Sequence, residues 1–213
     1  MSEAHLFAVG VLLAWLAGVR VYLTAFGVGI AGVFGWIDLP PALDAAASPW
    51  VLGVSGGLAL VEFFADKIPG VDSGWDLLQT LARVPAGAFL AAAALSPDGE
   101  LGAGMLATGA GVALTSHALK AGSRLLLNAS PEPVSNVVVS TAEDGLAIGA
   151  LGLALVSPWL ALGLVPRTLP TAYRPVRRRP GRRAGWAGRH RPPSAASTRS
   201  AGIRRGVGCR HRT

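Results

Sequence analysis

Hydrophobic residues fill long runs of this chain, and short groups of Pro, Gly and charged residues separate the runs. A membrane-spanning helix needs about 20 mainly apolar residues, and lengths of about 17–25 occur. Five runs reach that length: residues 5–36, 50–66, 75–95, 101–128 and 135–156. A sixth run begins at Trp159 and stops after seven residues, before Pro166. The pattern predicts an all-α, polytopic transmembrane helix bundle with five complete spans and a truncated sixth.

The first run is long enough for more than one helix, and Arg20 lies in its middle. Two interpretations are open, namely one tilted helix or two segments broken near Gly18. Glycine is abundant in the chain, with 28 residues, and it is commoner in transmembrane helices than in soluble ones.

The composition supports a membrane protein, but the net charge of +7 conceals a division. Only 15% of the residues are charged, against about 25% in a soluble domain. Residues 1–165 hold five basic residues and all twelve acidic ones, which gives them a net charge of −7. The other fourteen basic residues are all Arg and lie between Arg167 and Arg212. The chain therefore joins an acidic membrane core to a basic tail.

The tail, residues 166–213, contains no Lys and no acidic residue, together with many Pro, Gly and Ala. One interpretation is a basic segment that contacts anionic lipid, which we favour over nucleic acid as its partner. The other is a frameshift product, in which a slipped reading frame replaces the rest of the sixth helix. Both predict a transmembrane domain over residues 1–165 and a disordered Arg-rich tail over residues 166–213.

Charges in the predicted loops indicate an orientation. Acidic residues follow the first and third runs: Asp38, Asp44, Asp98 and Glu100. Basic residues lie near the turns after the second and fourth runs: Lys67, Arg83, Lys120 and Arg124. The positive-inside rule places those turns in the cytoplasm. The N-terminus is therefore expected to be cytoplasmic as well.

Polar and ionisable residues recur at helical spacing on both sides of these two turns, and steps of three and four residues place them on one helix face. The first group consists of Glu62, Asp66, Lys67, Asp72, Asp76 and Arg83. The second consists of His117, Lys120, Arg124, Asn128, Glu132, Asn136, Glu143 and Asp144. Each group predicts a charged helical hairpin.

These charges must face one another or water, because a charge in hydrocarbon costs about 2.5–3.5 kcal/mol on insertion scales. We expect acids of the first hairpin to pair with Lys120 and Arg124, and Arg83 to pair with Glu143 or Asp144. A structural ion-pair network near the cytoplasmic interface and a polar site are both open interpretations. Seven acids outnumber four bases in the two groups, so a small cation or a proton is the expected ligand. No spacing specifies a metal.

Two residues and the Gly-rich faces carry separate expectations. Arg20 is expected to pair with an acid of a neighbouring helix, and a lipid phosphate or an anionic substrate is the alternative. His117 is either a proton relay or a hydrogen-bonded residue between helices. Pairs of Gly at a spacing of four, such as 53 with 57 and 145 with 149, predict close helix packing and offer faces for a homo-oligomer.

An internal repeat relates the two hairpins at an offset of 62 residues. Pro69 matches Pro131 and Ser73 matches Ser135 at this offset. Such repeats are common in transporter folds, where interrupted helices in matching positions mark binding sites.

The motifs of the common enzyme classes are missing from the sequence: the phosphate loop, zinc patterns and the nucleophile elbow. We therefore expect no enzymatic activity and no cofactor. The preferred hypothesis is a small transporter or channel-like protein with a charged intramembrane site for cations or protons. A non-transporting scaffold that binds lipid or a partner membrane protein is the alternative. A lipid-modifying membrane enzyme is the third hypothesis.

Several segments resemble a known family. Residues 18–22, Gly-Val-Arg-Val-Tyr, are similar to its Gly-Leu-Arg-Ala-Tyr motif, and residues 61–76, 117–124, 130–136 and 143–144 are similar to its longer signatures. The chain is identified, over about residues 5–165, as a member of the bacterial membrane family catalogued as domain of unknown function 4126. The resemblance implies a multi-pass protein of the bacterial inner membrane and supplies no established activity.

Overall fold

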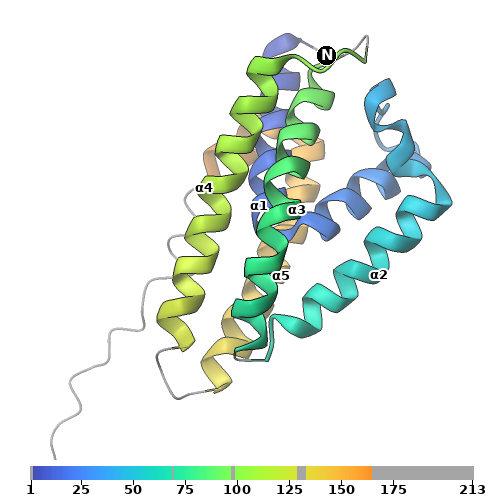
Figure 1. Cartoon of the computed structure of the whole chain (residues 1–213). Helices are drawn as coiled ribbons and strands as arrows, with labels where there is room; N and C mark the ends of the chain where they lie inside the picture. Colours follow the sequence, from blue (N-terminus) through green and yellow to red (C-terminus); the bar gives the residue numbers. More distant parts are fainter. Residues whose placement is uncertain (1, 69, 97–98, 129–132, 165–213) are drawn as a thin grey trace, which may run out of the picture. The chain divides into compact units, whose positions relative to one another are not determined.

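The computed structural model describes residues 2–68, 70–96, 99–128 and 133–164, and every regular element in this part of the chain is helical. The elements are α1 (Glu3–Val33), the 3₁₀ helix η1 (Pro41–Ala47), α2 (Pro49–Ala65), α3 (Val71–Ala94), α4 (Ala103–Asn128) and α5 (Pro133–Val156). Residues 158–164 form a further helical segment after α5. The predicted all-α class is confirmed (Figure 1).

Local sequence signals set where these helices begin. The Oγ of Ser2 accepts a hydrogen bond from the His5 N–H at 3.3 Å, and Ser48 caps α2 in the same way. A side-chain oxygen at this position satisfies one of the free N–H groups of the first turn. Gly70 precedes α3 with φ of 87°, a left-handed conformation that glycine adopts without a steric cost.

Helix α1 is broken at Arg20, whose φ of −145° and ψ of 77° are not helical. Figure 1 shows the two halves of α1 running in different directions from this point. Thr24 Oγ1 donates a hydrogen bond of 2.8 Å to the Arg20 carbonyl just after the break. Of the two interpretations of the first hydrophobic run, the broken helix is therefore confirmed.

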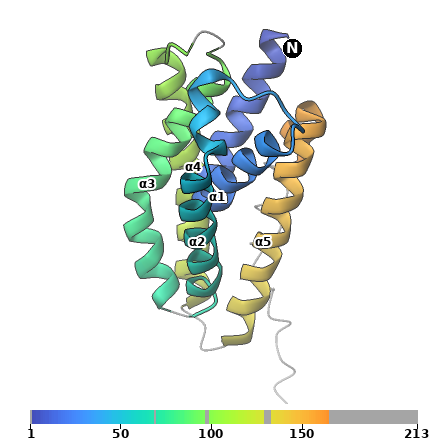
Figure 2. The ribbon, with the colours of Figure 1, turned by 90° about the vertical axis from the view of Figure 1, so that its right-hand side faces the viewer.

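Because of this break, α1 does not connect the two ends of the bundle. Figures 1 and 2 show the N-terminus at the same end as the C-terminal end of α3, and the turn between α2 and α3 at the opposite end. Leu43 of η1 also packs at the N-terminal end, in a cluster with Ala93 and Ala94. The N-terminus and the turn between α2 and α3 therefore lie at opposite ends of these helices, and the side of the membrane on which the N-terminus lies stays a prediction.

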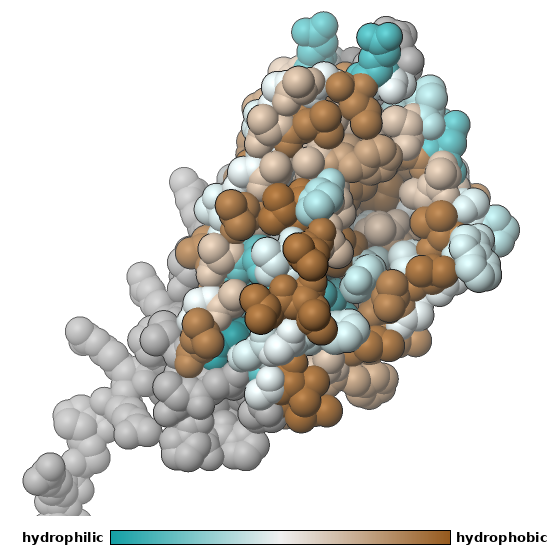
Figure 3. Space-filling model, viewed as in Figure 1, coloured by the Kyte–Doolittle hydropathy of each residue, from teal (hydrophilic) through white to brown (hydrophobic). Residues whose placement is uncertain are grey.

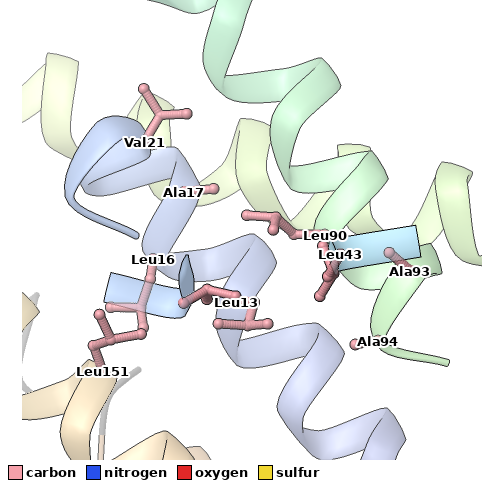
Figure 4. Packing of buried hydrophobic residues seen from close by; sticks show 10 residues of the cluster. Leu13, Leu16, Ala17, Val21, Leu43, Leu90, Ala93, Ala94 and Leu151 are labelled. Carbon is pink, nitrogen blue, oxygen red and sulfur yellow. The ribbon is translucent and has the colours of Figure 1, made fainter. Parts of the chain in front are cut away.

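The apolar core lies where the first half of α1 meets α3 and η1. Leu13, Leu16, Leu43 and Leu90 belong to one buried cluster, shown in Figure 4. Glycine permits the close approach of α1 to α4, since a Cβ added at Gly18 would overlap Ser116 and the Ala113 carbonyl. In contrast, α3 packs mainly on α4 and α1 and only weakly on α2, so the two predicted hairpins are not closely packed helix pairs.

The molecule buries charges and exposes large apolar side chains. Among the most exposed are Leu81 at 82% and Trp50 at 80%, whereas Arg83 and Asp66 are fully buried. Figure 3 shows apolar residues over much of the face it presents. A soluble protein arranges these groups the other way round. The distribution is that of a protein whose outer surface faces hydrocarbon.

Three helices in the described residues are long and apolar enough to cross a membrane: Glu3–Val33, Val71–Ala94 and Val137–Val156. A fourth span results if η1 and α2, which are bent by 68° at their junction, count as one. Three to four candidate spans indicate a multi-pass membrane protein. The five complete spans predicted from the sequence are not confirmed, since α4, with 26 residues and three basic or imidazole side chains, is not among the candidates.

The structure bears on the predicted packing of the paired glycines, but not on the Arg-rich tail. A Cβ added at Gly53, Gly57, Gly145 or Gly149 would meet no atom within 4 Å, so these glycines make no close helix contact inside the described chain. Their role in a homo-oligomer stays a prediction. The Arg-rich tail lies outside the described residues.

Candidate functional site

Asp66, the C-cap of α2, is the centre of one half of a buried ion-pair network. Its Oδ2 lies 2.8 Å from Arg20 Nη1, 2.8 Å from Lys120 Nζ and 3.6 Å from Arg124 Nη2. Arg20 belongs to the break in α1, while the other two bases belong to α4. One fully buried carboxylate therefore joins three elements. Charge-assisted contacts of this length are the strong class of hydrogen bond.

Arg83 of α3 is the centre of the other half. Its Nη2 donates to Glu62 Oε1 at 2.7 Å, and its Nη1 donates to Asp76 Oδ1 at 2.8 Å. It also donates to Gln79 Oε1. Lys120 Nζ lies 3.4 Å from Asp76 Oδ1 and so connects the two halves. The network is continuous from the end of α2 through α3 to α4.

Two adjacent acids of α5 complete the network. Asp144 forms an ion pair with Arg20 and a second one, of 3.0 Å, with Lys67. Glu143 Oε2 accepts a hydrogen bond of 2.5 Å from Arg124 Nη2. Helix α5 is therefore tied both to the break in α1 and to α4 by charged groups.

The first turn of α3 orients Asp72. Its Oδ1 accepts hydrogen bonds from the N–H groups of Gly70, at 2.9 Å, and Ser73, at 2.6 Å. Its Oδ2 lies 3.6 Å from Arg124 Nη1. An acid at the start of a helix is also stabilised by the helix dipole. Asp72 thus shapes the turn and adds a carboxylate to the network.

Side chains of α4 hold the end of the first half of α1. Ser116 Oγ donates to the Trp15 carbonyl at 2.8 Å, and Lys120 Nζ donates to the Val19 carbonyl at 3.2 Å. Carbonyls at a helix end have no partner within the helix, so they need partners from elsewhere. Lys120 therefore binds both the backbone of the break and the carboxylate of Asp66.

His117 is held in one tautomer by its neighbours. Its Nδ1 lies 2.9 Å from Arg83 Nη1, and its Nε2 lies 2.7 Å from Thr80 Oγ1. Arginine can only donate, so Nδ1 accepts and Nε2 carries the proton. The Thr80 hydroxyl in turn donates to the Asp76 carbonyl at 3.1 Å. The imidazole is thus neutral and joins the network through Arg83.

In two carboxylates of the network, only one of the two oxygens accepts a hydrogen bond from the described residues. Glu62 Oε2 and Asp76 Oδ2 are buried and receive no hydrogen bond from the residues that the structure describes. The other oxygen of each carboxylate accepts from Arg83. A buried oxygen without a donor is costly to keep charged. Within the described residues, each of these two carboxylates therefore has one oxygen available for a further donor.

The predicted pairs are partly right. Acids of the first hairpin bind Lys120 and Arg124 as expected, through Asp66 above all. The pairing of Arg83 with Glu143 or Asp144 is wrong. Arg83 binds acids of its own hairpin, because Asp76 lies two helical turns before it on α3 and α2 ends beside this face.

Arg20 belongs to the same network rather than standing apart from it, and its expected pairing with acids of neighbouring helices is confirmed.

Three predicted site residues give no structural result. Glu132 and the side chains of Asn128 and Asn136 lie outside the described part of the chain.

Sequence reasoning missed the contributions of Ser116 and Thr80. Both are small hydroxyl residues in apolar helices, and neither stands out from the other Ser and Thr residues of the chain. A faint signal existed for Ser116, which precedes His117 and lies four residues before Lys120 on α4. Its partner is a backbone carbonyl, which no side-chain pattern reveals.

The acids do not form a metal centre among themselves. Over residues 2–68, 70–96, 99–128 and 133–164, no group of three or more His, Cys, Asp or Glu side chains is arranged to hold a metal ion. Each acid of the network lies instead beside Arg or Lys. Calcium takes 6–8 oxygen ligands, whereas the carboxylates here contact basic side chains.

No curated protein and no solved structure matches this chain. The model of one family, described as a domain of unknown function (DUF4126), matches residues 7–178. The resemblance was expected to end near residue 165, so the match extends beyond that limit. The chain belongs to the DUF4126 family.

Proposed function

We propose that this protein is a small transporter or channel-like membrane protein in which the buried ion-pair network binds and passes protons or other small cations. One observation carries the proposal: α1 breaks at Arg20, and Arg20 there binds Asp66 of α2 and Asp144 of α5. The break, the charges and the meeting of several helices thus coincide at one place.

Broken helices support a transport role. Non-helical backbone at membrane depth is tolerated where it is buried in protein or lines a cavity, and transporters use it at their substrate sites. Here Lys120 Nζ donates to the Val19 carbonyl, directly before the break. Ionisable groups inside a membrane protein are costly and mark ion or proton pathways by default.

The charge balance favours a proton or a small monovalent cation. Six acids of the network face five bases in the described chain, which leaves one formal negative charge. The acids are Glu62, Asp66, Asp72, Asp76, Glu143 and Asp144, and the bases are Arg20, Lys67, Arg83, Lys120 and Arg124. A buried site with one surplus charge is neutralised by one bound cation. Glu62 and Asp76, each with an oxygen that lacks a donor, are the proposed carriers.

The proposed setting is the bacterial inner membrane, with lipid bilayer around the exposed apolar faces. The positive-inside rule places the turn that contains Lys67 in the cytoplasm. The N-terminus lies at the other end of the bundle (Figures 1 and 2). In this proposal the network lies towards the cytoplasmic side, and the N-terminus lies on the opposite side.

Ion flux into liposomes tests the proposal. The full chain is reconstituted, and the flux of protons, sodium, potassium and divalent cations is measured for the wild type, Asp66→Asn and Glu143→Gln. Asp44→Asn is the matched control, because Asp44 is exposed and outside the network. We expect proton flux in the wild type and the control and a loss in the two network variants.

A non-transporting scaffold predicts a different result. If no cation crosses the vesicle membrane, or if the network variants keep the wild-type flux, the network is a structural ion-pair cluster and the transport proposal fails. Co-purification of a stoichiometric membrane partner would then support a scaffold. Phospholipid turnover would instead support a lipid-modifying enzyme.

A further inference from the structure

A cleft of about 510 Å³ lies between the second half of α1, α2 and α5. This volume falls within the about 300–1,000 Å³ typical of small-molecule sites. Most of the lining is apolar and includes Leu23, Phe26, Leu52, Leu60, Phe63 and Ile148. Three charged residues of the network line it as well: Arg20, Glu62 and Asp144.

The cleft has a charged end and an apolar end. On α1, Arg20 is followed one and two turns later by apolar lining residues, and Asp144 of α5 is followed by Ile148. On α2 the apolar lining residues Leu52 and Leu60 come before the charged residue Glu62 in the sequence, the reverse of the order on α1 and α5. The ion pair of Arg20 with Asp144 brings the charged positions of two of these helices together. A ligand that fills this cleft has one polar and one apolar end.

The charged end offers one donor and one acceptor. Arg20 Nε and Glu62 Oε2 have no hydrogen-bond partner in the described part of the chain, although the two residues are only 2% and 1% exposed. Hydroxyl groups can accept from Arg20 Nε and donate to Glu62 Oε2. Two acids and one base line this end, and like charges repel, so an anionic phosphate or carboxylate is disfavoured.

The mouth of the cleft opens towards the membrane. Leu60 of α2 and Ile148 of α5 both line the cleft, and they are 63% and 59% exposed. Exposed apolar side chains on two candidate spanning elements face hydrocarbon in a bilayer, where aliphatic chains are the available occupants.

We propose that this cleft binds a single-chain amphiphile with an uncharged, hydroxyl-bearing polar group, such as a monoacylglycerol. The aliphatic chain lies along the apolar walls, and the two hydroxyl groups bind Arg20 and Glu62. Binding of the amphiphile requires no movement of ions, so this proposal goes beyond the proposed transport function. An experiment can therefore refute the amphiphile site without refuting transport, and the reverse.

Photolabelling tests the site. The full chain in phosphatidylcholine vesicles is exposed to monooleoylglycerol with a diazirine on its acyl chain, and the labelled peptides are mapped by mass spectrometry. Gly53→Leu fills the cleft, whereas Gly57→Leu lies on the same helix outside it. A Cβ at either position meets no atom within 4 Å, so both variants are compatible with the fold.

We expect labels on the lining residues of α1, α2 and α5, competition by unlabelled monooleoylglycerol, and a loss of labelling of about tenfold in Gly53→Leu but not in Gly57→Leu. Ile148→Trp, a second cleft-filling change at a half-exposed position, should lose labelling too. Equal labelling of all variants would overturn the site. Labelling by photoreactive oleate as strong as by monooleoylglycerol would overturn the assignment of an uncharged polar group.

Discussion

Arg20 and Asp66 form a 2.8 Å ion pair between the break in α1 and the end of α2. Both side chains are buried, at 2% and 0% exposure. Arg20 is at once the residue with non-helical backbone and the base that reaches two acids on other helices. The break in α1 and the ion-pair network therefore share one residue, Arg20.

Removal of the Asp66 carboxylate should destabilise the fold strongly. Asp66→Ala leaves Arg20, Lys120 and Arg124 buried without their shared acid, and breaking a buried ion pair in this way costs about 3–5 kcal/mol. Thermal unfolding in detergent should show a large drop in the midpoint. Asp44→Asn, at an exposed position, should shift the free energy of unfolding by no more than about 0.5 kcal/mol.

A second change separates charge balance from the loss of contacts. Asp66→Ala combined with Lys120→Met removes one acid and one base, so it should recover part of the lost stability. If the double variant is as unstable as the sum of the two single variants, the charges of Asp66 and Lys120 are not coupled.

Gly18 should not tolerate a side chain. A Cβ there would overlap Ser116 and the Ala113 carbonyl, and a backbone carbonyl cannot move without shifting α4. Gly18→Ala should cost about 1–3 kcal/mol, as overpacking does. Gly57→Ala is the matched control, because its Cβ meets open space and the change should stabilise α2 by about 0.5–1 kcal/mol. Equal unfolding midpoints for the two variants would contradict the close contact of α1 with α4.

His117 should be neutral, with its proton on Nε2. Arg83 donates to Nδ1, so only the other nitrogen can carry the proton. Nitrogen NMR of ¹⁵N-histidine-labelled protein distinguishes the two neutral tautomers, and comparison with His117→Gln identifies the signal. A protonated Nδ1 would show that Arg83 does not donate to this ring.

The two ends of the bundle should lie on opposite sides of the membrane. Single cysteines placed by Ser2→Cys and Glu100→Cys, in a Cys209→Ser background, should react with an impermeant maleimide from one side. Gly74→Cys, in the first turn of α3, should react only from the other side. Labelling of positions 2 and 74 from the same side would mean that α1 crosses the membrane completely.

Much of the fold could be predicted from the hydrophobic runs. The bounds of α2, α3, α4 and α5 lie within a few residues of the predicted runs, because Pro, Gly and charged groups punctuate the sequence clearly. The charged stripes also identified Asp66, Asp76, Lys120 and Arg124 as buried partners, since a charge between apolar turns must find a counter-charge.

The path of α1 could not be predicted in the same way. Its apolar run is continuous in composition, and the partner of the backbone next to Arg20 is a side chain of α4, Lys120, which donates to the Val19 carbonyl. The partners of Arg83 were misassigned for a related reason: spacing gives the face of a helix, but it does not show that the end of α2 brings Glu62 to Arg83.

Proton flux in liposomes, compared between the wild type and Glu62→Gln, tests the central claim most directly. The substituted amide keeps an oxygen that can accept from Arg83 but cannot carry the proton that the proposal assigns to Glu62, so the fold should be retained. With an imposed pH gradient and a fluorescent pH indicator inside the vesicles, we expect flux in the wild type and its loss in Glu62→Gln, with equal helical content of the two proteins by circular dichroism. Equal flux in both proteins, or none in the wild type, would contradict the account.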